Sequence, residues 1–186
     1  MKFRYSLPLL TIAALSLAGP KPALQSTSDT NWIETLRARI PLYGHRNWIV
    51  IADSAYPAQS RDGIETIVSG ADQISVLREV LADLSASKHV TPIVYTDEEL
   101  KFLGEKDAPG ISAYREQLGS LLQKRPRNSM LHEQIIAKLD QVSRTFRVLI
   151  IKTNMTLPYT SVFLQLDCAY WGPDAEHKLR ATMAAH

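Results

Sequence analysis

The sequence contains 186 residues, of which 45% are hydrophobic and 22% are charged, and its formal net charge is +2 at pH 7. This length and composition predict one folded α/β domain with a proper hydrophobic core. Residues 1–25 contain three basic residues and no acidic ones, so the chain without them would carry a net charge of −1. A chain with this charge balance has no basic surface for nucleic acid, and we exclude nucleic acid as a partner.

The first residues have the layout of a secretory signal. Lys2 and Arg4 precede an apolar run at residues 7–18, and small residues and prolines follow it. The run is shorter than the roughly 20 residues that a spanning helix needs, which disfavours the alternative of an uncleaved membrane anchor. We therefore expect a signal peptide at residues 1–25 and a single domain at residues 26–186. The mature protein would be exported, periplasmic or secreted, and would have no stable membrane span.

The apolar pattern predicts helices that alternate with strands. Trp32, Leu36 and Ile40 lie at helical spacing, so we expect a helix over residues 31–40. Residues 48–52, Trp-Ile-Val-Ile-Ala, form an unbroken run of strand formers, which is typical of a strand covered on both faces. Similar patterns predict strands at 64–68, 91–95, 147–153 and 159–166, and helices at 72–86, about 114–122, 131–144 and from 173 onward.

Capping patterns predict where two of the helices begin. Thr96 and Glu99 have capping-box spacing, so we expect a short helix that starts there and ends near Gly104. Ser129 is the expected N-cap of the helix at 131–144. The alternation of helices with apolar strands indicates a three-layer α/β fold, with a mostly parallel or mixed sheet and helices on both faces.

Polar residues at strand and helix ends are the candidates for a site, because α/β folds open their ligand crevices there. His45 precedes the strand at 48–52 and Asp53 follows it, while His132 lies at a helix start and Tyr159 opens the last strand. A strand rises about 3.3 Å per residue, so a straight backbone would hold His45 and Asp53 roughly 26 Å apart. These two residues can meet only if the chain bends or if another subunit supplies one of them.

Two other chemistries use residue types that are present. A hydrolase triad would combine Ser54 or Ser161 with His45 and Asp53, but the sequence has no Gly-x-Ser-x-Gly elbow. A zinc site would combine His45, His132 and Asp53, but no closely spaced histidine pair supports it. Neither the Rossmann nor the Walker pattern of glycines occurs, so no phosphate-binding loop is expected.

Residues 44–60 carry a resemblance to a known family. Gly44-His45, an apolar strand and then Asp-Ser-Ala-Tyr-Pro-Ala-Gln-Ser from Asp53 resemble the Gly-His, strand, Asp-Ala-x-x-Pro-x-x-Ser signature of ribose pyranase and fucose mutarotase (RbsD/FucU-type) proteins. Residues 146–166 look like the closing strand pair of that family, which includes a Tyr-x-Asn motif. His132, followed by Glu and Gln, is similar to the His-Glu-Gln of the ribose branch.

The resemblance implies an RbsD-like fold and a mutarotase or pyranase that interconverts anomers or ring forms of a free monosaccharide. It implies no metal and no organic cofactor. By the same resemblance His45 is the catalytic acid/base, and Asp53, His132, Tyr159 and Ser161 bind the sugar. The family builds its sites between subunits, so the resemblance also implies a homo-oligomer with sites at subunit interfaces.

The sequence departs from the family at three points. Asn47 stands where an acidic residue is common, and Ser161 stands where the family has the asparagine of Tyr-x-Asn, for which Asn154 is a candidate replacement. An export signal differs from the cytosolic location of familiar members. These departures leave two alternatives to the enzyme: a non-catalytic sugar-binding protein and a structural oligomer on the same fold.

Overall fold

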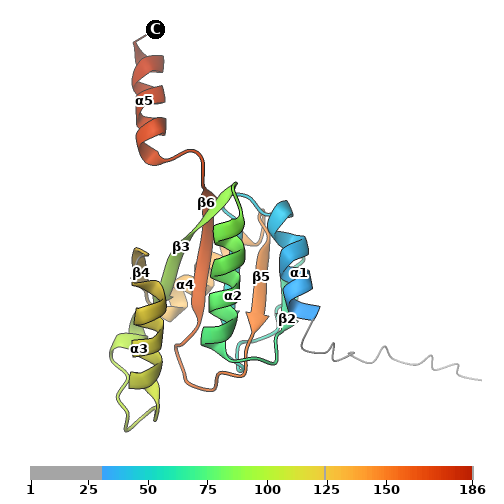
Figure 1. The fold of residues 1–186 in the computed structure, drawn as a ribbon, viewed down its shortest axis with the longest axis vertical. Helices are drawn as coiled ribbons and strands as arrows, with labels where there is room; N and C mark the ends of the chain where they lie inside the picture. Colours follow the sequence, from blue (N-terminus) through green and yellow to red (C-terminus); the bar gives the residue numbers. More distant parts are fainter. Residues whose placement is uncertain (1–30, 124, 186) are drawn as a thin grey trace, which may run out of the picture.

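The computed structural model describes residues 31–123 and 125–185 of the chain. The predicted signal peptide at residues 1–25 lies outside this part. Strands and helices are interspersed along the described chain (Figure 1). The strands are β1 (Trp48–Ala52), β2 (Ile64–Val68), β3 (Val90–Asp97), β4 (Arg127–Met130), β5 (Val148–Lys152) and β6 (Val162–Cys168). The helices are α1 (Asn31–Arg39), α2 (Gln73–Ala86), α3 (Ile111–Leu122), α4 (His132–Val142) and α5 (Pro173–Ala184), with 3-10 turns η1 (Ile40–Leu42) and η2 (Glu98–Lys101).

All six strands form one mixed sheet in the order β2-β5-β1-β6-β3-β4. The pairs β1–β5, β2–β5 and β3–β4 are parallel, whereas β6 is antiparallel to both of its neighbours, β1 and β3. The carboxyl ends of β1 to β5 and the amino end of β6 therefore lie at the same edge of the sheet. This carboxyl edge is the place where polar groups from distant parts of the sequence can meet.

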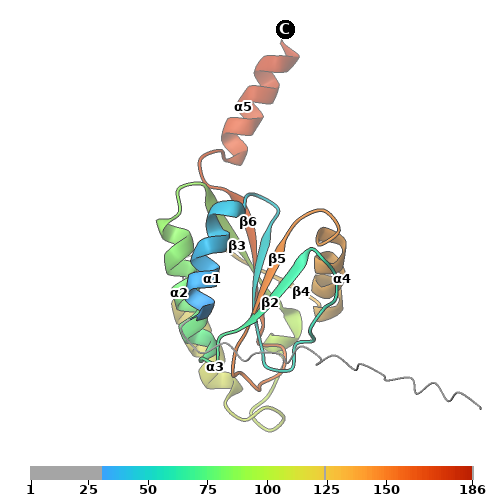
Figure 2. The same cartoon turned by 90° about the vertical axis from the view of Figure 1, so that its right-hand side faces the viewer.

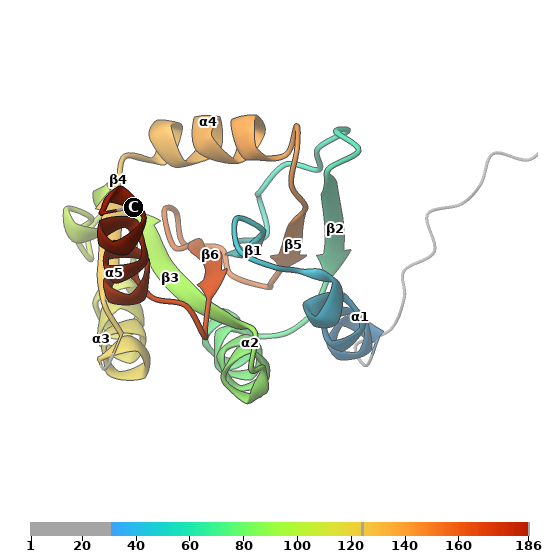
Figure 3. The ribbon, with the colours of Figure 1, turned by 90° about the horizontal axis from the view of Figure 1, so that it is seen from above.

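Helices cover both faces of the sheet and make three layers. Helices α1, α2 and α3 lie on one face and α4 lies on the other (Figure 3). Along β1, Ile49 and Ile51 belong to the core beneath the three helices, while Trp48, Val50 and Ala52 belong to the core beneath α4. All five side chains are buried, which confirms the prediction of a strand covered on both faces and of a three-layer α/β fold.

One proline lies inside a strand of the sheet. Pro92 is part of β3 and is in register with Leu166 of β6. On the other side of β3, strand β4 pairs only with residues 94–97. Pro92 therefore lies where one side of β3 has no partner strand, so its lack of an N–H removes no ladder bond on that side.

Two predicted N-caps, Thr96 and Ser129, are wrong, and both residues lie next to the carboxyl edge. Thr96 and Asp97 belong to β3, and only the short turn η2 follows them, without a side-chain cap. Ser129 lies in β4 opposite Thr96, and the N-cap position of α4 is Leu131, whose side chain makes no cap. The carboxylate of Glu99 instead accepts the backbone N–H of His132 at the start of α4.

Other boundaries differ by a few residues. Strand β4 was not expected, and β6 begins at Val162, so Tyr159 lies in the turn before the strand. Helix α3 begins earlier than predicted, at Ile111. Helix α2 begins as predicted, because the Asp72 side chain accepts a hydrogen bond from the backbone of Ser75 at 2.9 Å.

The last helix stands apart from the sheet and its covering helices (Figures 1 and 2). Pro173 occupies its first position, as predicted, and none of its residues is buried. No helix within residues 31–123 and 125–185 combines the length and the apolar character needed to cross a membrane.

Candidate active site

Buried polar side chains concentrate at the carboxyl edge. Eight polar or charged residues are buried in the described chain, and Ser143, at the end of α4, is the one that lies away from this edge. The other seven lie at the carboxyl edge. Ser69 and Thr153 follow β2 and β5, Thr96 and Asp97 end β3, Gln73 begins α2, and Thr160 and Ser161 precede β6. Because burying polar groups costs free energy unless they are satisfied, such a concentration indicates a built site.

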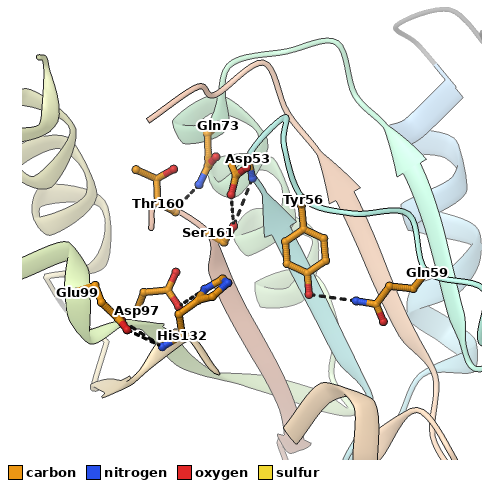
Figure 4. A network of polar contacts seen from close by, with 9 residues as sticks. All are labelled: Asp53, Tyr56, Gln59, Gln73, Asp97, Glu99, His132, Thr160 and Ser161. Atoms are coloured by element: carbon orange, nitrogen blue, oxygen red, sulfur yellow. Dashed lines mark hydrogen bonds and ion pairs between the residues drawn. The ribbon is translucent and has the colours of Figure 1, made fainter. Parts of the chain in front are cut away.

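Asp53 and Ser161 form the first pair of this site (Figure 4). The hydroxyl of Ser161 donates to Oδ2 of Asp53 at 3.0 Å, and the backbone N–H of Asp53 donates back to the same hydroxyl at 3.3 Å. Oδ1 of Asp53 accepts the N–H of Ala55 at 2.9 Å. The carboxylate is therefore fixed on both oxygens, while its half-buried position leaves room for further donors such as sugar hydroxyls.

His132 and Asp97 form the second pair. Nδ1 of His132 lies 3.1 Å from Oδ1 of Asp97. The backbone N–H of His132 donates to both carboxylate oxygens of Glu99, each at 3.1 Å. The imidazole side chain is 37% exposed, whereas the Asp97 side chain is fully buried. Two carboxylates from consecutive parts of the chain thus hold His132, one through its ring and one through its backbone.

Asp97 is the one charged residue that is buried in the described chain. Burial raises the pKa of its carboxyl to about 6; the nearby His132 opposes this rise, and Glu99 and Asp53 add to it. Its second oxygen, Oδ2, is buried and has no hydrogen-bond partner among the described residues. A buried carboxylate with one unsatisfied oxygen is unfavourable for stability, and such groups occur preferentially at functional sites.

Tyr159 lies beside the imidazole of His132. The two ring centroids are 5.6 Å apart and the ring planes meet at 84°, an edge-to-face contact. The backbone of Tyr159 has a φ of 55°, in the left-handed region that residues with a side chain rarely adopt. Its side chain is partly exposed. The turn before β6 therefore holds this aromatic ring at the site in an unfavourable backbone conformation.

A buried network beneath the site fixes the turn that carries Tyr159 and Ser161. The side-chain amide of Gln73 donates to the hydroxyl of Tyr114 at 3.1 Å and to the carbonyl of Thr160. The Tyr114 hydroxyl donates to the same carbonyl, and the hydroxyl of Thr153 lies 3.0 Å from the Gln73 side-chain oxygen. Burial raises the pKa of the Tyr114 hydroxyl, so it stays a donor. We did not predict these residues, although a glutamine next to the apolar stripe at the start of a helix was a usable signal.

Tyr56 closes the side of the site next to the α4 core. It is buried, and its hydroxyl accepts a hydrogen bond from Gln59 at 3.4 Å (Figure 4). Burial raises the pKa of Tyr56 to about 12. Its hydroxyl therefore keeps its proton throughout the neutral pH range.

His45 lies in an exposed turn before β1, at the opposite edge of the sheet from Asp53. Asn47 stabilises this turn, because its side-chain oxygen accepts the N–H of Gly44 at 2.8 Å and its amide donates to the carbonyl of Arg147 at 3.3 Å. Arg46, between them, has a positive φ of 73°. Asn47 thus has a structural role here, and one chain does not bring His45 to the other candidate residues.

The separation of His45 from Asp53 in one chain disfavours both the hydrolase triad and the zinc site. One chain assembles neither the hydrolase triad nor the zinc site, since each requires His45 next to Asp53. The hydroxyl of Ser161 donates to Asp53 rather than to an imidazole. In the part of the chain that the structure describes, no three side chains that bind metals are grouped in a suitable way. The amide nitrogen of Asn154 donates to the carbonyl of Gly70, so it is directed to the turn before α2.

Comparisons with known proteins place this geometry in a known fold. No family model and no curated protein matches the sequence. The structure is similar to RbsD from Bacillus subtilis complexed with D-ribose, with a TM-score of 0.50, 17% identity and coverage of 80% of this chain and 97% of that chain. It is also similar to FucU from Bifidobacterium longum, with a TM-score of 0.50, 16% identity and coverage of 72% and 94%.

The fucose mutarotase of Streptococcus pneumoniae in complex with L-fucose matches with a TM-score of 0.46, 18% identity and coverage of 74% and 91%. The similarity to RbsD from Bacillus subtilis and to FucU from Bifidobacterium longum shows that the chain has their α/β fold, as the resemblance in residues 44–60 predicts. It shares this fold at low sequence identity. Its chemistry must be argued from its own residues.

Proposed function

We propose that the protein is a monosaccharide mutarotase or pyranase, which interconverts anomers or ring forms of a free sugar by histidine-mediated proton transfer. The observation that carries this proposal is the partly exposed imidazole of His132, held by buried Asp97 at the same edge of the sheet as Asp53. RbsD, which shares the fold, was solved with D-ribose, and this supports a free monosaccharide as the ligand.

The reaction needs few groups. Ring opening requires that one group removes the proton of the anomeric hydroxyl and that another delivers a proton to the ring oxygen. Imidazole can do either at neutral pH, since its ordinary pKa is about 6.5. In this proposal His45 is the acid/base and His132 assists it, while Asp53 accepts hydrogen bonds from sugar hydroxyls. Tyr159 and Ser161 line the sugar, and no metal or organic cofactor takes part.

A complete site requires a second copy of the chain, because His45 lies at the opposite edge of the sheet. We propose a homo-oligomer in which the edge that carries His45 meets the carboxyl edge of a neighbour. Charge supports this arrangement. Arg46 follows His45 in the chain and the backbone of Arg147 bonds to Asn47 at the same edge, whereas Asp53 and Glu99 lie at the carboxyl edge. Opposite charges on two surfaces favour their association and fix its orientation.

The second candidate is a non-catalytic sugar-binding protein. The position of His45 favours a binding protein if the chain acts alone. In a single chain Asp53, His132, Tyr159 and Ser161 lie at one edge of the sheet, and His45 lies at the opposite edge. Such a chain would bind sugar hydroxyls without the second proton-transfer group. The two candidates therefore differ in whether subunits assemble around a shared site.

Saturation-transfer NMR with a panel of free aldoses separates these candidates. The proposal predicts that at least one sugar exchanges anomers or ring forms faster with the wild-type protein than in buffer. Binding of a sugar without faster exchange would support the binding protein instead. If no aldose binds or exchanges, the mutarotase proposal is wrong and the structural oligomer is favoured.

We also propose export of the protein, on the basis of the pattern in residues 1–25. Expression with its own N-terminus in a bacterium with two membranes, followed by cell fractionation and intact mass measurement, tests this. A periplasmic product that lacks about 25 residues is the expected result. A full-length cytosolic product would contradict it.

A further inference from the structure

We propose that Asp97 is a positioning residue that holds His132 in one tautomer, with the proton on Nδ1 and the lone pair of Nε2 toward the open side of the site. The consequence for catalysis rests on the proposed function, whereas the tautomer itself does not. Asp97 lies between Thr96 and Glu99 of the predicted capping box and was not among the candidate site residues. Its role follows from its contacts in the fold.

The geometry allows one direction of hydrogen bonding when Asp97 is ionised. A carboxylate only accepts, so the 3.1 Å contact between Oδ1 and Nδ1 requires the imidazole to donate from Nδ1. A neutral imidazole carries a single N–H, so Nε2 is then an acceptor. Because the Asp97 side chain is fully buried and the ring is 37% exposed, Nε2 is the nitrogen available to a ligand (Figure 4).

Two further contacts limit the movement of the ring. Glu99 holds the backbone of His132 with both carboxylate oxygens, which fixes the first residue of α4. Tyr159 contacts the imidazole edge to face, with the ring centroids 5.6 Å apart, and this contact limits rotation of the ring. A carboxylate that orients an imidazole and selects its tautomer is a recurring arrangement in acid/base catalysis. Here it would make Nε2 of His132 a base toward a sugar hydroxyl.

The unpartnered Oδ2 of Asp97 supports a functional reading over a structural one. A carboxylate retained only for stability would be expected to use both of its oxygens, because a buried oxygen without a hydrogen-bond partner is destabilising. Oδ2 is buried and without a hydrogen-bond partner among the described residues. The one side-chain partner of the Asp97 carboxylate in the described chain is the imidazole.

Long-range proton–nitrogen correlation spectra of the protein labelled with ¹⁵N-histidine read the tautomer directly. The signals of His132 are assigned as those absent from His132→Gln. At about pH 8 the wild type should show a protonated Nδ1 and an unprotonated Nε2. In Asp97→Asn the preference should be lost, while Glu98→Gln should leave it unchanged, since Glu98 is paired with Lys101 and does not contact His132.

A wild-type His132 with its proton on Nε2 would overturn the proposal even if no variant folds. An unchanged tautomer in folded Asp97→Asn would overturn it as well. For a sugar that the wild type exchanges, Asp97→Asn should lower kcat roughly 100-fold with little change in KM. If the wild type exchanges no sugar, the mutarotase proposal fails, but the tautomer still decides the role of Asp97.

Discussion

Glu99 and His132 lie 33 positions apart in the chain, and both carboxylate oxygens of Glu99 accept the backbone N–H of His132 at 3.1 Å. The N-cap position of α4 is Leu131, which offers no side-chain acceptor. Glu99 therefore satisfies one of the free donors at the start of this helix and places a negative charge at its positive end.

We expect Glu99→Ala to reduce the free energy of unfolding by about 1 kcal/mol, because the helix loses the carboxylate that acts as its cap. Urea denaturation followed by circular dichroism measures this loss. Glu98→Ala is the matched control, since that partly exposed carboxylate pairs with Lys101 three residues away and should contribute less than about 0.5 kcal/mol. Equal effects of the two changes would remove the capping role of Glu99.

The raised pKa of Asp97 predicts a dependence of stability on pH. Burial raises this pKa to about 6, above that of the unfolded chain, so the folded state binds the proton more tightly. The associated stability is fully present below about pH 4 and is lost as the pH rises through about 6. His132, Glu99 and Asp53 face this carboxyl and set the size of the effect.

Asp97→Asn should therefore be more stable than the wild type by about 2 kcal/mol at about pH 8, with the difference shrinking toward about pH 4. Denaturation curves at several pH values test this, with Glu98→Gln as the control that follows the wild type. A loss of stability in Asp97→Asn at every pH would show that the buried carboxylate has a net stabilising role.

His45→Ala should abolish sugar exchange and leave the fold intact. The side chain lies in an exposed turn, so its removal should change the free energy of unfolding by less than about 0.5 kcal/mol. Exchange NMR and thermal unfolding of the same preparation measure both effects. A large drop in melting temperature would instead indicate that His45 contributes to stability.

Asp53→Asn should weaken sugar binding more than it slows the chemistry of bound sugar. The carboxylate is assigned to hydroxyl recognition, and charge-assisted hydrogen bonds are about twice as strong as neutral ones. Affinity and exchange rate are measured separately, with the exposed Asp62→Asn as control. Unchanged affinity in Asp53→Asn would exclude Asp53 from sugar recognition.

The shared site predicts complementation between inactive subunits. The mature chain should elute well above the size of a monomer in size-exclusion chromatography with light scattering. Mixing His45→Ala subunits with Tyr159→Phe subunits should restore some exchange, because some sites then combine His45 and Tyr159 from different chains. A fully active monomer would contradict the shared site. No restored exchange in a confirmed mixed oligomer would contradict a site that combines His45 with Tyr159.

The elements that the sequence predicted well are those with an unambiguous apolar period. β1 and β5 are apolar because both faces are covered, and α2 has a clear stripe and an Asp72 cap. β4 escaped prediction because Arg-Asn-Ser-Met is a polar edge strand, partly exposed, that forms only by pairing with β3. Strand formation there depends on tertiary contacts that local pattern does not encode.

The site was predictable only in part, for a related reason. Asp53, His132, Tyr159 and Ser161 were expected, and the fold brings them to one edge of the sheet. Thr96 and Glu99 do have the spacing of a capping box, but Glu99 caps another helix 33 residues away. Asp97 could not be distinguished from a surface carboxylate, because its burial depends on how β3 lies between β6 and β4.

Strand β4 has only four residues, and its pairing with β3 places Met130 opposite Asp97, two residues before His132. A slip of one residue in this pairing would move His132 by about 3.3 Å, more than the tolerance of a hydrogen bond to Asp97. Short edge strands open locally more easily than central ones. Amide hydrogen exchange in β4 should therefore report how often the Asp97–His132 contact breaks. A further backbone hydrogen bond to β4 would lengthen the lifetime of that contact.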